Sequence, residues 1–340
     1  MQREVILITG SNGEIGHGLI DYLQQHCDKD ILSFDIVPLD SSLQPYCCQH
    51  IQGDILDLAL LDQINQDYKI STIFHLASLL STKGEKDPEM AHNVNVNGTF
   101  QLLKVADQQG EKFGRPVKFI YPSSIAAYGI PNLKTRAAAG KVKENQFLEP
   151  TTMYGINKLY CEHLGRYFMR YYGQISPGGA RGNIDFRVLR FPGLISPITL
   201  PTGGTTDYGP EMLHHAAQDK PYACFVRPDT RLPFMVMSDA IKSLILLETA
   251  HKDALTQMVY NVTSFSPTAK ELYKIVLDAF PAADISFVVD QNRQKFVDTW
   301  PEDIDDTVAK TDWGWQPDYD QDRSFTELLI PAVKERYGLM

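Results

Sequence analysis

The sequence predicts an α/β fold, in which a doubly wound parallel sheet is followed by a smaller C-terminal lobe. Short apolar runs alternate with helix-length segments through the first half of the 340 residues, and this alternation indicates βαβ units. The runs are almost continuously apolar, which is typical of strands covered by helices on both faces. A glycine-rich turn separates the first run from the first helix-length segment.

Seven apolar runs are expected to be strands, and three of the segments between them are expected to be helices. The expected strands are Val5–Thr9, Ile31–Asp35, Cys48–Gln52, Thr72–Leu76, Lys118–Pro122, Phe186–Phe191 and Val259–Val262. The expected helices are Gly16–His26, Asn95–Gln109 and Tyr154–Tyr172.

The second half of the chain has a different pattern. Residues 196–209 are rich in Pro, Gly and Thr and predict a loop. Ser266 before Pro267 predicts the start of a helix with the serine as its N-cap. Asp239 is interpreted as the cap of another helix, and residues 285–289 are a further expected strand.

The charge balance argues against two classes of partner. Acidic residues number 42 and basic residues 32, which gives a net charge of −10. Nucleic acid and anionic membranes are both disfavoured, because each attracts a basic face. No apolar run approaches the ~20 residues of a membrane span, and the first ten residues lack the apolar core of a signal peptide. We therefore expect a cytoplasmic protein.

The cysteines and histidines predict neither disulfides nor metal. Five scattered cysteines form no disulfide framework, and we interpret them as reduced thiols. The adjacent pair Cys47 and Cys48 leaves a redox-active role as the alternative. The nine histidines show no metal-ligand spacing, so no metal site is expected.

The turn Gly10-Ser-Asn-Gly13-Glu-Ile-Gly16 has the spacing of a dinucleotide-binding fingerprint. The first glycine allows the tight turn, the second lets backbone N–H groups approach a pyrophosphate, and the third allows close helix–strand packing. Asp35 ends the next strand, where a carboxylate can bind the adenosine ribose and oppose the 2′-phosphate of NADP. We therefore predict a Rossmann-type domain that binds NAD, with Asp54 facing the adenine amino group.

The expected domain boundaries follow from this assignment. Residues 1–191, joined by about 238–263, are expected to form the NAD-binding domain. Residues 192–237 and 264–340 are expected to form a substrate-binding lobe over the carboxyl ends of the strands, where open α/β sheets bind ligands.

A second group of residues predicts proton-transfer chemistry. Tyr154 and Lys158 are four residues apart, which places both side chains on one face of the expected helix. A lysine ammonium beside a phenol stabilises the phenolate, so we expect Lys158 to lower the pKa of Tyr154 toward neutrality. The phenolate can then accept a proton from a substrate hydroxyl. Ser124, at the end of an expected strand, can hold the same substrate oxygen.

Further motifs carry a family resemblance. They are His75-Leu-Ala-Ser78, Asn93-Val-Asn95-Val-Asn97-Gly98 and Pro122-Ser-Ser-Ile-Ala-Ala-Tyr-Gly129. With these motifs, the chain resembles the extended branch of the short-chain dehydrogenase/reductase superfamily along essentially its whole length. The resemblance implies that Lys158 also holds the nicotinamide ribose. The implied cofactor-binding residues are Gly10, Asn12, Gly13, Glu14, Ile15, Gly16, Asp35, Asp54, Ile55, Leu76, Ala77, Ser78, Asn95, Tyr154, Lys158, Pro192 and Leu194.

The substrate class depends on the segments after the sixth strand. Sugar-nucleotide members of this branch carry an Asn there that helps to bind the diphosphate, and Gly193 stands at that position. The following segments resemble the L-threonine 3-dehydrogenases of the branch: Phe191–Ser196, Gly203–Tyr208, Tyr222–Phe225, Pro228–Pro233, Trp300-Pro301 with Asp305-Asp306, and Asp312–Trp315.

This second resemblance implies an activity. It is the NAD-dependent oxidation of L-threonine at C3 to 2-amino-3-oxobutanoate, with Tyr154 as general base and with Lys158 and Ser124 as further catalytic residues. The implied substrate-binding residues are Ser78, Ser124, Tyr154, Gly193, Thr205 and Thr206. Two alternatives remain: a sugar-nucleotide epimerase or dehydratase, and a non-catalytic NAD-binding regulator, against which the intact catalytic set argues.

Several stretches stay outside this scheme. Residues 196–201 lack the aromatic residue and lysine usual in the family, and residues 130–149 look like an insertion. Trp313 and Trp315 are interpreted as packing residues, and Arg231 as either a substrate contact or an ion-pair partner. His214 and His215 are expected at the surface.

The family also implies a homodimer. The helices expected at residues 95–109 and 154–172 would pair with their symmetry mates in a four-helix interface. The second helix carries more apolar residues than one sheet-facing stripe needs, namely Leu159, Leu164, Tyr167, Phe168 and Tyr171.

Overall fold

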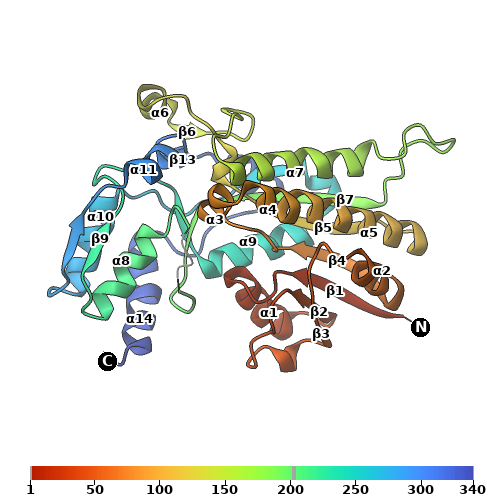
Figure 1. Ribbon diagram of the computed structural model, residues 1–340, viewed down its shortest axis with the longest axis horizontal. Helices are drawn as coiled ribbons and strands as arrows, with labels where there is room; N and C mark the ends of the chain where they lie inside the picture. The colour runs from red at the N-terminus through yellow and green to blue at the C-terminus, as the bar shows by residue number, and fades with distance from the viewer. Residues whose placement is uncertain (1, 201–203, 340) are drawn as a thin grey trace.

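The computed structural model describes residues 2–200 and 204–339. Its centre is a parallel seven-stranded sheet with the order β11-β7-β5-β4-β1-β2-β3 (Figure 1). The strands are β1 (Arg3–Thr9), β2 (Asp30–Asp35), β3 (Gln49–Gln52), β4 (Tyr68–His75), β5 (Val117–Ser124), β7 (Ile184–Phe191) and β11 (Val259–Asn261). All seven expected strands are present, which confirms the doubly wound α/β fold.

Alternate residues of the central strand β1 face two separate helical layers. Ile6 and Ile8 pack with α1 (Glu14–His26) and α9 (Met237–Thr249). Val5 and Leu7 pack on the other face with α2 (Leu58–Asp67), α5 (Gly98–Phe113) and α7 (Met153–Arg170) (Figure 1). This two-sided burial explains why the strands read as continuous apolar runs.

The helix expected at Asn95–Gln109 begins earlier than the sequence indicated. It is preceded by α3 (Ser81–Lys86) and α4 (Pro88–His92), and a π-helical turn at Asn93–Asn97 leads directly into α5. Such turns often mark functional sites because they redirect side chains within a helix. Here the turn carries Asn95, which belongs to one of the family motifs.

A smaller lobe lies beside the carboxyl ends of the strands, at the left of Figure 1. Two parallel strand pairs frame it, β8 (Gly193–Ile195) with β10 (Phe234–Val236) and β9 (Tyr222–Cys224) with β12 (Ile285–Phe287). Its helices are α8 (Tyr208–Ala217), α10 (Ala269–Ala279), α11 (Gln291–Val297), the π-helical Ser324–Leu329 and α14 (Ile330–Arg336). The expected strand at 285–289 is therefore present.

Short elements complete the chain. They are Gln44–Tyr46, Ile125–Ala127, α6 (Leu133–Ala139), β6 (Lys141–Val142), Lys252–Ala254, β13 (Asp303–Ile304), α12 (Thr307–Trp313) and α13 (Gln321–Arg323). Trp313 and Trp315 pack beside α9 and Tyr260, so their interpretation as packing residues is confirmed. Pro201, Thr202 and Gly203, in the expected loop, lie outside the described residues.

Two predicted helix caps were wrong. Helix α10 is capped by Thr268, not Ser266, because Thr268 and Glu271 form a capping box. Ser266 donates to Asp303 instead. Asp239 lies inside the first turn of α9, where its carboxylate accepts the N–H groups of Asp318 and Tyr319.

His214 is buried rather than exposed, with a ring nitrogen 3.1 Å from the Tyr337 hydroxyl. His215 beside it is partly buried. The C-terminal helix α14 thus packs against α8, a contact between segments more than a hundred residues apart.

Candidate active site

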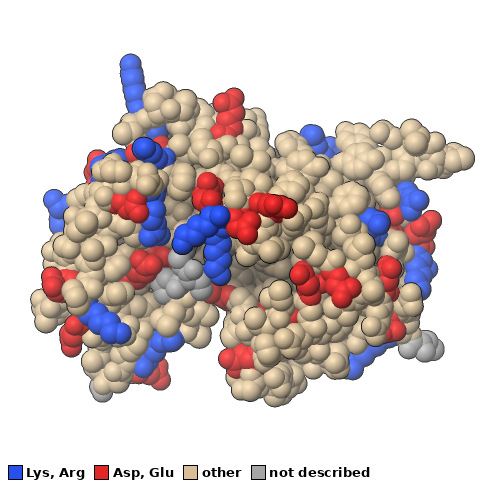
Figure 2. Space-filling model, viewed as in Figure 1, with Lys and Arg blue, Asp and Glu red and all other residues tan. Residues whose placement is uncertain are grey.

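A pocket of about 390 Å³ opens between the smaller lobe and the carboxyl ends of β1, β4, β5 and β7. Figure 2 shows the hollow between the two parts of the molecule. Residues from both halves of the sequence converge on it. The lining residues that the sequence had predicted are Gly10, Gly13, Glu14, Ile15, Gly16, Leu76, Ser78, Ser124, Tyr154, Lys158, Pro192, Leu194, Thr205 and Thr206.

The turn after β1 requires its glycines. Gly10 has a φ of +67°, and a Cβ there would lie 2.5 Å from the backbone nitrogen of Ala77. A Cβ on Gly16 would lie 2.4 Å from the Ser11 carbonyl oxygen. The turn therefore presents bare backbone to the pocket at the N-terminus of α1. This is the cradle that a dinucleotide pyrophosphate needs, so the residues present fit such a cofactor.

Asp35 holds this turn in place from the end of β2. One carboxylate oxygen accepts the N–H of Asn12 at 2.8 Å, and the other accepts the N–H of Val37 at 3.2 Å. Asp35 and Asn12 do not line the pocket themselves. Asp35 remains half-buried at the strand end, where the sequence had predicted an acidic group.

Five other predicted residues also lie outside the pocket lining: Asp54, Ile55, Ala77, Asn95 and Gly193. Asn95 acts on the lining indirectly, because its amide accepts the N–H of Leu79 at 2.7 Å and donates to the Leu79 carbonyl at 3.0 Å. Asp54 accepts the N–H of Leu56 within its own turn. A Cβ at position 193 would lie 2.5 Å from the Phe234 ring.

Helix α7 presents Tyr154 and Lys158 from a firmly fixed first turn. Thr152 caps the helix by accepting the N–H of Gly155 at 3.1 Å, and Glu85 of α3 accepts the N–H of Met153 at 2.7 Å. The Lys158 ammonium donates to the Pro122 carbonyl at 2.7 Å and lies 5.4 Å from the centre of the Tyr154 ring. Tyr154, Lys158 and the strand-end serines thus meet in one place.

The pKa of Tyr154 differs from the expectation that Lys158 would lower it. Burial raises the pKa of Tyr154, and the hydrogen bond with Ser124 opposes that rise only in part. The predicted lowering by Lys158 is therefore not present in this structure. Burial also lowers the pKa of Lys158 to about 8. Desolvation dominates both shifts, and for Lys158 it outweighs the opposing effects of Cys161 and Glu162.

A buried ion pair lies behind the reactive residues. Glu162 lies one helical turn after Lys158. Its carboxylate accepts a hydrogen bond from Nε of Arg190 at 2.9 Å and another from a second guanidinium nitrogen at 2.6 Å. The same carboxylate accepts the hydroxyl of Ser123 at 2.6 Å. Both charged side chains are almost fully buried. Burial alone would lower the pKa of Arg190, but Glu162 raises it, so the guanidinium stays charged.

His75 ends β4 beneath the pocket. Its two ring nitrogens lie 2.8 Å from the hydroxyls of Thr9 and Thr99. Burial, with a smaller contribution from the nearby Lys158 charge, lowers the pKa of His75 to about 3. The ring is therefore neutral at physiological pH, and it ties β1 and α5 to the strand end.

The sequence reasoning missed several lining residues, among them Ser81, Lys83, Asp207 and Trp300. Ser81 is buried, and its hydroxyl oxygen lies 2.9 Å from that of Thr205. Trp300 is 3% exposed, and its indole nitrogen has no hydrogen-bond partner among the described residues. No periodic pattern marks any of them. The tryptophan lies within one of the segments that carry the family resemblance, which was the available signal.

Two acidic residues line the pocket from opposite sides. Glu14 begins α1, and Asp207 precedes α8. Burial and, to a smaller extent, the Asp207 charge raise the pKa of Glu14 to about 7.

Other predicted groups take no part in this pocket. Arg231 does not line it; the side chain pairs with Glu271 at 3.3 Å, as the ion-pair interpretation expected. All five cysteines are free thiols, and burial raises the pKa of Cys47 and Cys48, which makes both less reactive.

Neither a metal cluster nor a membrane-length helix occurs in the described part of the chain. In residues 2–200 and 204–339, no group of three or more His, Cys, Asp or Glu side chains could hold a metal ion. Within the same ranges, no helix is both long and apolar enough to cross a membrane.

Comparisons with known proteins agree with this geometry. The family model of the NAD dependent epimerase/dehydratase family matches residues 6–263. The mitochondrial L-threonine 3-dehydrogenase of Bos taurus is 32% identical over 327 residues, which cover 96% of this chain and 82% of the relative.

Solved structures give the same picture. A monomeric L-threonine 3-dehydrogenase from a metagenome is 36% identical with a TM-score of 0.82, covering 97% of this chain and 99% of the other. The L-threonine 3-dehydrogenase of Trypanosoma brucei is 31% identical with a TM-score of 0.83, covering 100% and 99%.

Proposed function

This chain belongs to the NAD-dependent epimerase/dehydratase family, and on that premise we propose that it is an L-threonine 3-dehydrogenase. The reaction is the oxidation of L-threonine at C3 to 2-amino-3-oxobutanoate. The observation that carries the proposal is the convergence of Tyr154, Lys158 and Ser124 on the pocket that the glycine turn and the smaller lobe also line.

The family uses a nicotinamide cofactor, and we propose NAD as the form that this chain binds. Gly10, Gly13 and Gly16 would hold the pyrophosphate against the N-terminus of α1. Asp35, half-buried at the end of β2, supports NAD over NADP because a carboxylate repels a 2′-phosphate. When bound, the nicotinamide supplies the hydride acceptor.

The residues of the chain have distinct roles in this proposal. Ser124 holds the C3 hydroxyl of threonine, and Tyr154 accepts its proton. In this role Tyr154 acts as the phenolate, and the Lys158 cation, 5.4 Å from its ring, opposes the burial that raises the pKa of the phenol. The bond from Lys158 to the Pro122 carbonyl keeps the ammonium beside β5, where Ser124 lies.

The smaller lobe supports a small amino acid as the substrate. Thr205 and Thr206 line the pocket, and Trp300 presents an indole N–H without a partner among the described residues. A hydroxyl can donate or accept, and an indole N–H only donates, so the set suits a carboxylate and an ammonium group. Gly193 offers no side-chain amide for a diphosphate, and the Phe234 ring fills the space where a side chain would extend.

One experiment tests this function. Purified protein is mixed with NAD and, in turn, L-threonine, other 3-hydroxy amino acids, 3-hydroxy acids and UDP-sugars, and NADH is followed by absorbance. We expect NADH from L-threonine and neither binding nor interconversion of UDP-glucose and UDP-galactose. Micromolar binding of a UDP-sugar in calorimetry, with no threonine turnover, would replace the proposal by an epimerase.

The remaining assignments are part of the same proposal. We assign cofactor binding to residues 1–191 with about 238–263 and the substrate lobe to the rest, with a homodimer formed through α5 and α7. Exposed apolar side chains on these two helices, and one directly after α7, support the dimer: Phe100, Ile156, Tyr160, Tyr167 and Tyr171. Phe168, which the sequence reasoning had placed on this face, is buried instead, and Leu159 and Leu164 are half-buried.

A further inference from the structure

Trp300 forms a wall of the pocket from a short connection between α11 and β13. Its side chain is 3% exposed, and its backbone N–H donates to the Val297 carbonyl at 3.1 Å. The indole nitrogen makes no hydrogen bond with any described residue. An unpaired buried donor is unfavourable, so a ligand that accepted a hydrogen bond from this indole would relieve that cost, and the position of the indole would affect binding.

The buried guanidinium of Arg136 fixes the backbone at this wall. Arg136 lies in α6, within the stretch that looked like an insertion, and is 3% exposed. Its Nε donates to the carbonyl of Trp300 itself at 2.7 Å. A second nitrogen contacts Glu302 at 3.1 Å, and the third donates to the Arg231 carbonyl. A planar guanidinium holds three such partners in one fixed arrangement.

Other residues of the insertion-like stretch also contact the chain on both sides of Trp300. The N–H of Ile130 donates to the Thr299 carbonyl at 2.7 Å, next to Trp300. Strand β6 pairs with β13, so Lys141 and Val142 lie opposite Asp303 and Ile304. Residues 299–304 are thus held from both ends by residues 130–142, which leave the sheet directly after the Ser124 strand.

We propose that Arg136 is a positioning residue for substrate binding, which acts by holding the Trp300 indole at the pocket wall. The inference rests on the proposed function and gives the insertion-like stretch a role, because it connects the strand that carries Ser124 to the wall contributed by the smaller lobe. Loss of the guanidinium removes the hydrogen bond to the Trp300 carbonyl, and the indole N–H then shifts from the position at which it meets the substrate. The proton-transfer residues are untouched.

Steady-state kinetics of Arg136→Met test the proposal. We expect the KM for L-threonine to rise about tenfold, with kcat within about threefold and the KM for NAD within about twofold. Arg136→Lys should recover part of the loss because it keeps the charge and one donor. It also serves as the milder variant if Arg136→Met does not fold.

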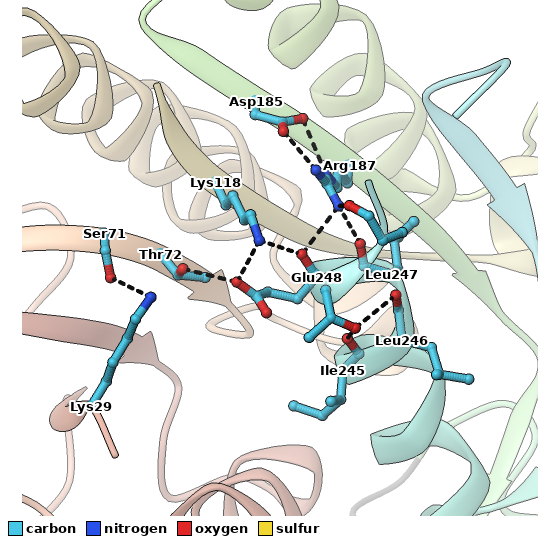
Figure 3. A network of polar contacts seen from close by, with 12 residues as sticks. Lys29, Ser71, Thr72, Lys118, Asp185, Arg187, Ile245, Leu246, Leu247 and Glu248 are labelled. Carbon is cyan, nitrogen blue, oxygen red and sulfur yellow. Dashed lines mark hydrogen bonds and ion pairs between the residues drawn. The ribbon is translucent and has the colours of Figure 1, made fainter. Parts of the chain in front are cut away.

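The matched control is Arg187→Met, which removes another buried arginine, one that does not line the pocket. Arg187 pairs with Asp185 at 2.7 Å and donates to the carbonyls of Leu247, Glu248 and Ala250 at the end of α9 (Figure 3). The Arg187→Met variant should lower Tm at least as much as Arg136→Met does. It should leave the KM for threonine within twofold of the value for the unaltered protein. Equal KM changes in the two variants would overturn the proposal.

A double-variant cycle separates positioning from general destabilisation. Trp300→Phe removes the indole N–H and keeps an aromatic ring, so its KM should also rise. Because Arg136 acts through Trp300, the combined variant should show a KM within about twofold of the larger single effect. A KM equal to the product of the two single effects would contradict the inference.

Fluorescence gives a reading that needs no substrate. The contribution of Trp300 is taken as the difference between each protein and its Trp300→Phe counterpart. In Arg136→Met this contribution should become more accessible to acrylamide than in the unaltered protein. If it does, while the unaltered protein fails to oxidise threonine, the proposed function is wrong and the role of Arg136 at the wall stands. Unchanged accessibility overturns the role of Arg136.

Discussion

Ser81 and Thr205 join the two sides of the pocket: their hydroxyl oxygens lie 2.9 Å apart although 124 residues separate them in the chain. Both side chains are buried, at 5% and 3% exposure. Ser81 begins α3, the helix that follows β4 in the chain, and Thr205 belongs to the smaller lobe. The pair is therefore a direct link between the sheet side and the smaller-lobe side of the pocket.

Ser81→Ala tests this link. It leaves the Thr205 hydroxyl without its partner, at a cost of about 1–3 kcal/mol. We expect the KM for threonine to rise at least about fivefold and NAD affinity to stay within twofold. Ser42→Ala, which removes an exposed hydroxyl bound to Asp40, is the control and should change neither. An unchanged KM in Ser81→Ala would show that the link plays no part in binding.

Tyr154→Phe removes the proposed base. We expect kcat to fall at least ~100-fold, as is typical of a lost general base, with NAD binding retained. Tyr160→Phe is the control, since Tyr160 lies on the same helix with about half its side chain exposed. Turnover in Tyr154→Phe close to that of the unaltered protein would remove this residue from the mechanism.

Asp35→Asn tests the choice between NAD and NADP. The substitution keeps one acceptor for the glycine turn and removes the charge that opposes a 2′-phosphate. We expect the ratio of kcat/KM for NAD over NADP to fall at least about tenfold. Asp40→Asn, an exposed acid close in sequence, should keep the original ratio. A preference for NADP in the unaltered protein would show that the role of Asp35 is misassigned.

His75 should impose an acid limit on stability. Its pKa of about 3 in the folded protein lies below the ordinary value of 6.5, so the unfolded chain binds the proton more readily between these values. The contribution of neutral His75 to the free energy of unfolding is fully present above about pH 6.5. Below that pH it falls by up to about 1.4 kcal/mol per pH unit.

Chemical denaturation at pH 6.5 and 4.5 measures this effect. His75→Gln should lose about 2–3 kcal/mol less than the unaltered protein between the two pH values. The exposed His92→Gln is the control and should lose as much as the unaltered protein. Parallel losses in all three proteins would contradict a neutral, buried His75.

The proposed dimer predicts a concentration-dependent mass. Light scattering at micromolar concentration should give twice the chain mass, and Tyr160→Glu on the exposed face of α7 should shift it toward monomer. Ile175→Glu, at a 97% exposed position beyond α7, should leave the mass unchanged. A monomer throughout this range would refute the interface.

The sequence predicted those features that depend only on residues close together in the chain. The glycine turn, the strand-end Asp35 and Ser124, and the four-residue spacing of Tyr154 and Lys158 each follow from short-range geometry. Thr268 was also within reach, because Glu271 three residues later completes a capping box that Ser266 lacks.

Other features depend on contacts that no local pattern records. The burial of His214 rests on Tyr337, which is 123 residues away. The raised pKa of Tyr154 depends on how deeply the folded chain encloses the phenol, and spacing to Lys158 says nothing of that. Trp300 reaches the pocket only because the smaller lobe lies beside the carboxyl ends of the strands.

The ion pair of Glu162 and Arg190 has a consequence for how new specificities can arise on this scaffold. It fastens α7, β5 and β7 together directly behind Tyr154, Lys158 and Ser124, so the reactive groups are supplied by one rigid block. Thr205, Thr206 and Trp300 come from segments outside that block. On the proposed function, proton transfer and the choice of substrate therefore come from different segments of the chain, so substitutions in the second set of segments can redirect the enzyme while the first set is kept.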